Sequence, residues 1–234
     1  MGGFPLYLAC AFGHEDIVDV LLESGVNVNQ ALSSDGSTGL LIAIEEGYFS
    51  IVKKLINASA DMHQASSFSF PLYMACNENH EDIVDYLLEK QVNVNQATEV
   101  NGRTSLMLSC IEGRSTIVKK LLAASANVKQ RKKGGITALY IACQFNHLEI
   151  VQLLIDARCD LDIGHAYGST PFYLACVKGF TEIAALLINS GCDIEKAATL
   201  DDEQWTALQA ANNFKQTDIV DLINASIKKR KKKA

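Results

Sequence analysis

Seven cysteines are the residues of this chain best suited to metal binding or disulfide formation. They fall into two recurring positions: Cys10, Cys76, Cys110, Cys143 and Cys176 follow a small residue, whereas Cys159 and Cys192 precede an aspartate. Their number is odd, and no pair has the Cys-x-x-Cys spacing of a zinc or redox site. Like positions of neighbouring stacked helices lie about 8–10 Å apart, whereas a disulfide needs Cα atoms within about 7 Å. We therefore expect free, buried core cysteines in a reducing compartment.

Three histidines, His14, His80 and His147, recur at one position and are the next candidates for chemistry. Two of them precede glutamate, as in the zinc motif His-Glu-x-x-His, but no second histidine follows four residues later. We expect these histidines to hydrogen-bond the backbone of a loop. A glycine-rich phosphate loop and a Gly-x-Ser-x-Gly nucleophile motif are both missing from the sequence. The sequence thus predicts no enzyme, no cofactor, no metal and no small-molecule substrate.

Charge is distributed unevenly along the chain. Six basic residues lie near the end: Lys228, Lys229, Arg230, Lys231, Lys232 and Lys233. The other 228 residues carry 15 basic and 27 acidic groups, a balance of −12 that argues against a nucleic-acid-binding body. The run at 227–234 is typical of a nuclear-import signal, an electrostatic anchor or a solubilising linker, and we expect its last seven residues to be disordered.

A repeated segment dominates the sequence. FPLYLACA at 4–11 returns as FPLYMACN at 70–77, TALYIACQ at 137–144 and TPFYLACV at 170–177, with divergent copies at 38–45, 104–111 and 206–213. The small residues at its centre are 34, 32, 34, 33, 33 and 36 residues apart: Ala9, Ala43, Ala75, Ser109, Ala142, Ala175 and Ala211. Repeats one and three match closely, as do two and four, which indicates duplication of a two-repeat unit of 66 residues.

Each repeat predicts two helices. Prolines at 5, 71 and 171 suit the first helical position, and glycines at 13, 47, 113 and 179 suit the residue after a helix end. A second helix follows with apolar pairs at helical spacing, such as Ile17, Val18, Leu21 and Leu22. Asp19, Lys53, Asp85 and Lys119 share one position of this second helix, so we expect opposite charges to lie side by side on its outer surface.

With its period near 33, the chain resembles the ankyrin repeat family from Phe4 to about Ser226. The resemblance implies an all-α solenoid of stacked helix–turn–helix units joined by β-hairpin-like turns. One domain, 1–226, would hold seven repeats at about 4–34, 35–66, 67–100, 101–133, 134–166, 167–200 and 201–226. The family's usual histidine after its Thr-Pro-Leu element is replaced here by tyrosines at 7, 73, 140 and 173.

The resemblance also implies a binding surface, because ankyrin stacks bind partners on their concave face. The matching positions form a graded surface, acidic in repeats two and three and apolar further on: Glu45, Glu46, Glu78, Arg103, Ile111, Ile136, Phe145, Tyr167, Val177, Trp205 and Phe214. Trp205 alternatively caps the last repeat. Exposed aromatic side chains are typical anchors of interfaces, so we expect a partner segment that is both apolar and basic.

The family is further known for asparagine hydroxylation at the terminal turn, a pattern that Asn29 and Asn95 resemble. The function expected is protein–protein recognition by a scaffold or adaptor. The alternative is a recognition segment of a larger enzyme, channel or effector. No segment has the apolar length of a membrane span, so we expect a monomeric intracellular protein of the cytoplasm or nucleus.

Overall fold

The computed structural model describes residues 4–165, 167–200 and 203–231. The chain divides into two compact units, Met1–Ala126 and Asn127–Ala234. Within the described residues there are fourteen helices and one two-stranded sheet, which confirms the all-α prediction. The predicted single domain of seven repeats spans both units and stays a prediction.

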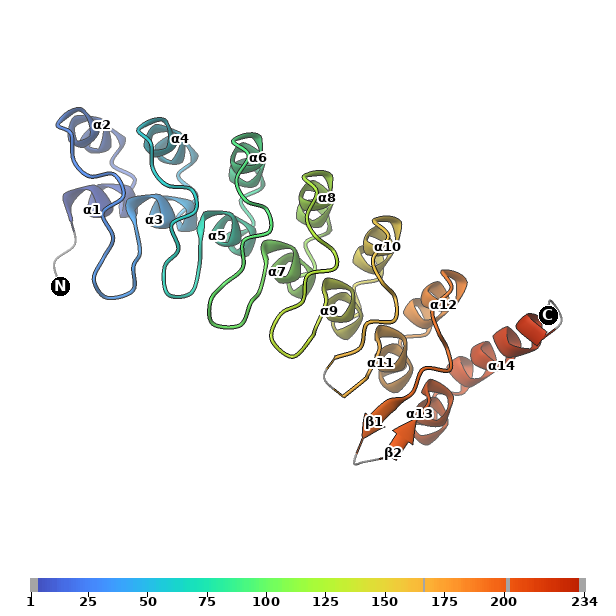
Figure 1. Ribbon diagram of the computed structural model, residues 1–234. Coiled ribbons are helices and arrows are strands. Elements are labelled where there is room, and N and C mark those ends of the chain that lie inside the picture. Colours follow the sequence, from blue (N-terminus) through green and yellow to red (C-terminus); the bar gives the residue numbers. More distant parts are fainter. Residues whose placement is uncertain (1–3, 166, 201–202, 232–234) are drawn as a thin grey trace. The chain divides into compact units, whose positions relative to one another are not determined.

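The first unit holds four helix pairs (Figure 1). Its helices are α1 (Pro5–Ala11), α2 (Glu15–Glu23), α3 (Gly39–Glu45), α4 (Phe49–Asn57), α5 (Pro71–Glu78), α6 (Glu81–Glu89), α7 (Ser105–Ile111) and α8 (Ser115–Ala123). The first helices of the pairs, which we call inner helices, pack in the order α1, α3, α5 and α7. The second or outer helices α2, α4, α6 and α8 pack in a parallel row, which lies above the inner helices in Figure 1. Single antiparallel bridges, Ala31 to Thr38 and Ala97 to Thr104, mark hairpin turns between pairs.

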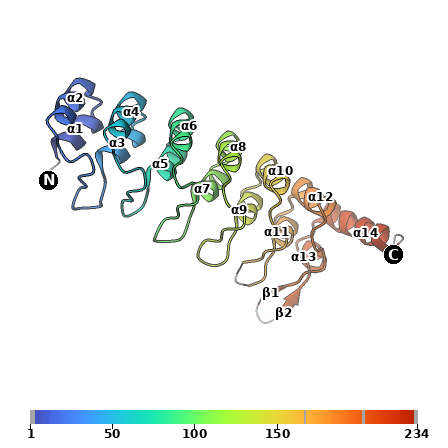
Figure 2. The same ribbon diagram turned by 45° about the horizontal axis from the view of Figure 1, so that its top comes forward.

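The second unit continues the same alternation with three pairs (Figure 2). Its elements are α9 (Ala138–Gln144), α10 (Leu148–Asp156), α11 (Pro171–Lys178), α12 (Thr181–Asn189), β1 (Ala198–Leu200), β2 (Glu203–Trp205), α13 (Ala207–Asn213) and α14 (Thr217–Lys231). Strands β1 and β2 are antiparallel, with Ala198 opposite Trp205. Here too the inner helices α9, α11 and α13 pack on one another.

The inner helices begin where the sequence predicts. Pro5, Pro71 and Pro171 occupy the first helical turn of α1, α5 and α11, where a missing N–H leaves no hydrogen bond unmade. Threonine side chains cap the others: the Thr38 hydroxyl, for example, accepts the backbone N–H of Leu41 at 3.2 Å.

The glycine after an inner helix allows both the turn that ends the helix and the close approach of the next helix pair. Gly47 has φ of 74°, and a Cβ added there would lie 2.6 Å from the His80 ring of the next pair. The ring nitrogen Nε2 of His80 lies 3.3 Å from the carbonyl oxygen of Glu45, so the histidine does contact the backbone, but at the last residue of α3 and not in a loop as predicted. A side chain at residue 47 would therefore oppose both the turn and the approach of the neighbouring pair.

The core runs along the seam between the two rows of helices. In the outer helices the same isoleucine and leucine columns are buried; in the first unit these are Ile51, Ile83 and Ile117 with Leu55, Leu87 and Leu121. The five cysteines that follow the small residue are all fully buried, and none is in a disulfide bond in the described part of the chain. Their burial confirms their predicted place in the core. Burial raises the pKa of the Cys76 thiol to about 12, so that thiol stays protonated at neutral pH.

Charges on the outer helices pair differently from the prediction. Lys54, not Lys53, reaches the preceding pair, where its ammonium lies 2.7 Å from Asp19 and 3.2 Å from Glu15. These contacts, that with Asp19 foremost, raise the pKa of Lys54. Lys53 instead places its ammonium 4.7 Å from the ring centre of Phe49. Because adjacent helical residues point about 100° apart, only the second lysine faces the neighbouring helix.

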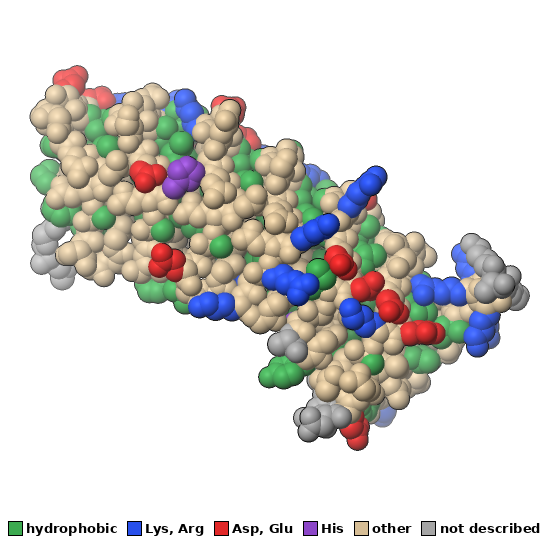
Figure 3. All heavy atoms as spheres, in the orientation of Figure 1, with side chains coloured by type: hydrophobic (Ala, Val, Ile, Leu, Met, Phe, Trp, Pro, Cys, Tyr) green, Lys and Arg blue, Asp and Glu red, His purple; other side chains and the backbone are tan. Residues whose placement is uncertain are grey.

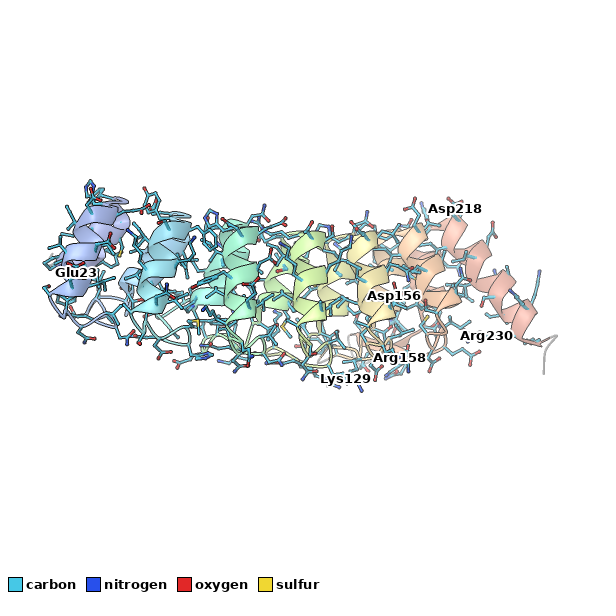
Figure 4. The ribbon with its side chains drawn as sticks, turned by 90° about the horizontal axis from the view of Figure 1, so that it is seen from above. Glu23, Lys129, Asp156, Arg158, Asp218 and Arg230 are labelled. Atoms are coloured by element: carbon cyan, nitrogen blue, oxygen red, sulfur yellow. The ribbon has the colours of Figure 1, made fainter. Side chains whose placement is uncertain are left out.

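The predicted disorder of the last seven residues is wrong for those described. Helix α14 continues to Lys231, and Arg230 donates a hydrogen bond to the Cys192 carbonyl oxygen at 3.2 Å. Figure 4 shows Asp218 near the first turn of α14 and Arg230 near its last. An acidic residue in the first turn and basic residues in the last turn stabilise the helix. The reason is that a helix has a partial positive charge at its N-terminus and a partial negative charge at its C-terminus. Lys232 and Lys233 lie outside the described residues.

Replacing Leu121 by alanine should lower the free energy of unfolding by about 2–5 kcal/mol, because its side chain is fully buried and leaves a cavity. Urea titration of the full chain measures this loss. Leu122→Ala is the matched control, since Leu122 is only half-buried and should cost clearly less. Equal losses for the two variants would contradict this assignment of the core.

Candidate protein-interaction surface

The inner surface of each unit comprises the exposed sides of its inner helices and the adjoining hairpins. In the first unit it is acidic where predicted. Glu45 ends α3, Glu46 follows it, and Glu78 ends α5; all three side chains are exposed. Partial burial raises the pKa of the Glu45 carboxyl, and the charges of Glu78, Glu46 and Asp35 add to that effect. The inner surface therefore holds mutually repelling carboxylates that a cation would stabilise.

Arg103 lies just before α7 and Ile111 is its last residue; both are half-buried. The backbone N–H of Arg103 is held by the Thr98 hydroxyl and the Asn101 side-chain oxygen, each at 3.1 Å. The Nε of Arg103 is buried with no hydrogen-bond partner among the described atoms. These two residues therefore contribute less accessible surface than the acidic group.

An aromatic chain lies on the inner surface of the second unit. The rings of Tyr140 and His165 are 5.5 Å apart between centres, and those of His165 and Tyr167 are 5.4 Å apart. Tyr140 is buried in α9, whereas Tyr167 is exposed on the hairpin. Hydrogen bonds fix the hairpin, because the Tyr167 N–H donates to Nδ1 of His165 and its carbonyl accepts the Thr199 N–H. Tyr167 is thus an exposed ring on a supported backbone.

The remaining predicted residues of this unit are spread along α9, α11 and α13. Phe145 follows α9 and Phe214 follows α13; both rings are exposed. The Phe145 ring stacks on that of His147, with 6.2 Å between the ring centres. Phe145 follows α9, whereas Tyr167 lies in the loop before α11. Half-buried positions complete the set: Ile136, Val177 and Trp205.

Among the exposed apolar residues of the first unit that the sequence-based prediction of the surface did not include, two lie in loops. Phe68 and Val100 lie in the loops before α5 and α7, and both side chains are largely exposed. The loop that carries Phe68 is hydrogen-bonded to the loop before α3, because the N–H and the hydroxyl of Ser67 both donate to the Asp35 carbonyl oxygen. The sequence did contain a signal for their exposure, since each is an apolar residue within a predicted turn of small and polar residues.

Asn29 and Asn95, the predicted hydroxylation positions, lie in the loops after α2 and α6. The Asn29 side chain joins two repeats: its Oδ1 accepts the Asp61 N–H at 2.7 Å, and its Nδ2 donates to the Ser59 carbonyl at 3.4 Å. At Asn95 the backbone N–H donates to the Asn93 side chain at 3.1 Å. Asn29 is half-buried by these contacts, so it has a structural role of its own.

The hollow at the loops of the second unit has a volume of about 680 Å³ and is lined by charged side chains of both signs, among them Arg131, Asp160, Asp193 and Lys196. Among the described residues of this lining there is no cysteine, serine or histidine. Across the part of the chain that the structure describes, no group of three or more His, Cys, Asp or Glu side chains could hold a metal ion. None of the described helices has the length and apolar character needed to cross a membrane.

Comparison with curated proteins finds partial likenesses. The chain is 33% identical over 106 residues to Protein fem-1 homolog A-like of Mus musculus, which covers 44% of this chain and 16% of that protein. It is 39% identical over 87 residues to Glycerophosphocholine phosphodiesterase GDE1 of Candida albicans, covering 36% of this chain and 7% of the enzyme. The chain thus spans a small part of the length of these relatives.

Solved structures match along most of the chain. The ankyrin repeat domain of Bcl-3 superposes with a TM-score of 0.84 at 20% identity, covering 95% of this chain and 99% of that one. The human ASB11 ankyrin repeat domain superposes with a TM-score of 0.75 at 24% identity, covering 89% and 92%. At such identities the likeness establishes the fold alone.

The family model of ankyrin repeats in three copies matches residues 1–66, 40–132, 120–198 and 139–233. Ankyrin repeats are protein–protein interaction modules. Together with helix pairs that recur about every 33 residues, these matches show that the chain belongs to the ankyrin repeat family.

Proposed function

We propose that this protein is an intracellular scaffold or adaptor that binds a partner protein through the inner surface of its repeats. The observation that carries the proposal is the set of exposed rings on the second unit: Phe145, Tyr167 and Phe214. Rigid aromatic side chains contribute much of the binding energy of interfaces.

The partner segment is apolar and basic. Apolar side chains of the partner bury the exposed rings of the second unit. Its basic side chains meet Glu45, Glu46 and Glu78 on the first unit, where partial burial and then like charges raise the pKa of Glu45. Charge complementarity of this kind accelerates association and selects among partners.

The second candidate function is a recognition segment within a larger enzyme, channel or effector. This candidate is favoured because the chain covers only 16% and 7% of the length of two relatives. The second of these relatives is named as a phosphodiesterase. In that case the repeats bind the partner or substrate protein, and the activity belongs to residues outside this sequence.

The basic residues 228–233 and the two asparagines are proposed as secondary sites. The described lysines 228, 229 and 231 are exposed on the last turns of α14, where they form a cationic surface for an import receptor or another acidic partner. Arg230 has a structural contact with Cys192, so truncation would disturb the fold as well as the charge. Asn29 and Asn95 remain proposed hydroxylation sites, which intact mass after exposure to an asparaginyl hydroxylase would test.

The double variant Phe145→Ala, Tyr167→Ala should lose at least about tenfold in affinity for the partner, because each truncated ring removes buried apolar surface. Affinity capture from lysate identifies the partner, and titration calorimetry with the purified partner measures the loss. Leu148→Ala is the matched control, since it truncates an exposed apolar side chain on the outer helix α10.

A further variant separates the tail from the inner surface: Lys228→Gln, Lys229→Gln, Lys231→Gln keeps Arg230 in place. Loss of binding in this variant alone would make the basic turns the binding element. Unchanged affinity of the aromatic double variant would contradict the proposed surface.

Glu78→Gln should lower the pKa of Glu45, because Glu78 contributes the largest charge repulsion that, after burial, raises this pKa. An NMR titration of the side-chain carboxyl resonances measures both values. Glu89→Gln, an exposed change at the end of outer helix α6, is the control and should leave Glu45 unaffected. An unchanged Glu45 pKa in Glu78→Gln would show that the two carboxylates do not interact.

A further inference from the structure

The hairpin loop before α7 contains an asparagine that is followed directly by a glycine, Asn101 with Gly102. Of the 15 glycines in the sequence, this is the only one that follows an asparagine. The backbone nitrogen after an asparagine can attack the carbonyl carbon of the asparagine side chain, because both groups belong to one chain and the attack closes a five-membered ring. A side chain on the following residue obstructs this attack, and glycine has none. Asn101 is therefore the asparagine of this chain best placed to react with its own backbone.

Two hydrogen bonds hold the side-chain carbonyl of Asn101. Its oxygen accepts the Thr98 hydroxyl at 2.9 Å and the backbone N–H of Arg103 at 3.1 Å. Donors on a carbonyl oxygen stabilise the negative charge that this oxygen gains when a nucleophile adds to the carbon. Gly102 has a φ of 69°, so the turn itself favours the residue that leaves the attack unobstructed.

Two backbone hydrogen bonds close this loop. The N–H of Gly102 donates to the Thr98 carbonyl at 2.9 Å, and the N–H of Thr98 donates to the Arg103 carbonyl at 2.9 Å. The bridge from Ala97 to Thr104 lies at the base of the hairpin. The Gly102 nitrogen must leave the Thr98 carbonyl before it can attack, and a surface loop closed by a few such bonds opens without unfolding of the core. The folded chain can therefore reach the reactive arrangement.

Repeat two contains an aspartate at the equivalent position. Its hairpin carries Asp35 before Gly36, and the Asp35 side-chain oxygen accepts the Ser37 N–H at 3.0 Å. The N–H of Gly36 donates to the Leu32 carbonyl at 2.9 Å, and Gly36 has a φ of 78°. These contacts match those of the hairpin before α7, with a carboxylate in place of the amide. An aspartate therefore fits this turn without a change of backbone.

We propose that Asn101 is a site of spontaneous deamidation, at which the folded chain exchanges an amide for a carboxylate. The Gly102 nitrogen gives up its proton to solvent and forms a bond to the side-chain carbon of Asn101. The bond from that carbon to the amide nitrogen then breaks, and ammonia leaves. Water opens the resulting imide, at the side-chain carbon to give aspartate or at the main-chain carbon to give isoaspartate. The overall change consumes one water and releases one ammonia, so solvent is the only co-reactant.

Deamidation adds a negative charge to the inner surface of the first unit. The lower edge of this unit in Figure 3, where the hairpin loops hang in Figure 1, shows few charged side chains, so one more carboxylate changes the local charge. Isoaspartate also lengthens the main chain by one methylene group, which displaces Arg103 from Thr98 and breaks their backbone hydrogen bond. The reaction depends on this loop alone and not on the function proposed for the inner surface.

Peptide mapping by mass spectrometry of the full chain, kept folded at mildly alkaline pH, follows the conversion at each asparagine. Asn101 should convert at least about tenfold faster than Asn29 and Asn95, which are both followed by glutamine. Gly102→Ala should slow the conversion at Asn101 by about tenfold or more, because the added methyl group obstructs the attack. Since alanine is strained at this φ and loosens the turn, a slower reaction in this variant cannot come from a tighter loop.

The same chain in urea gives the rate of the unfolded state. Conversion at Asn101 in urea alone would show that the folded hairpin excludes the reaction, and it would overturn the proposal. A folded rate no faster than that at Asn95, or one that Gly102→Ala leaves unchanged, would overturn it as well. Asn101→Asp should leave the thermal midpoint nearly unchanged, because Asp35 is accommodated in the same turn of repeat two. A large fall of the midpoint would show that the folded hairpin does not accept the aspartate product.

Discussion

Each helix pair in this chain has two apolar faces, and it can bury both only when another pair lies on either side. Burial of the isoleucine and leucine columns is complete in pairs that have a predecessor and incomplete in the first pair, although the residues are the same. Stability in such an array comes from the contacts between nearest neighbours, so no repeat is a folding unit by itself. The small residues and cysteines of the inner helices serve this constraint, because they let neighbouring helices approach closely.

The polar contacts between repeats follow the same nearest-neighbour order. His80 contacts the carbonyl of the preceding inner helix, Asn29 joins its loop to the next one, and Lys54 meets two carboxylates of the preceding outer helix. Exposed ion pairs contribute little to stability individually. The positions of these contacts nevertheless favour one alignment of neighbouring helix pairs, since a shift of one pair against the next would separate the contacting groups.

Because the frame depends on buried seams and loop backbone, the inner surface is free to carry other residues. Glu45, Glu46 and Glu78 repel one another there, and Phe145 and Tyr167 expose their rings, without loss of the core beneath them. Function in a repeat protein lies in such surface residues, which is why likeness to other ankyrin domains establishes the fold and not the partner.

The sequence by itself determined the repeat, the start of each inner helix and the burial of the cysteine column, because these depend on local spacing that recurs seven times. It also indicated that a recurring histidine contacts the backbone, although at His80 the acceptor is the last carbonyl of the preceding inner helix and not a loop. Three features required the tertiary structure. Lys54 rather than Lys53 faces the neighbouring helix, α14 extends through the basic residues with Arg230 on the Cys192 carbonyl, and Phe68 and Val100 are exposed on loops. Each depends on the direction of a side chain towards another repeat, and that direction is set by how neighbouring helices pack and not by the residues next to it in the chain.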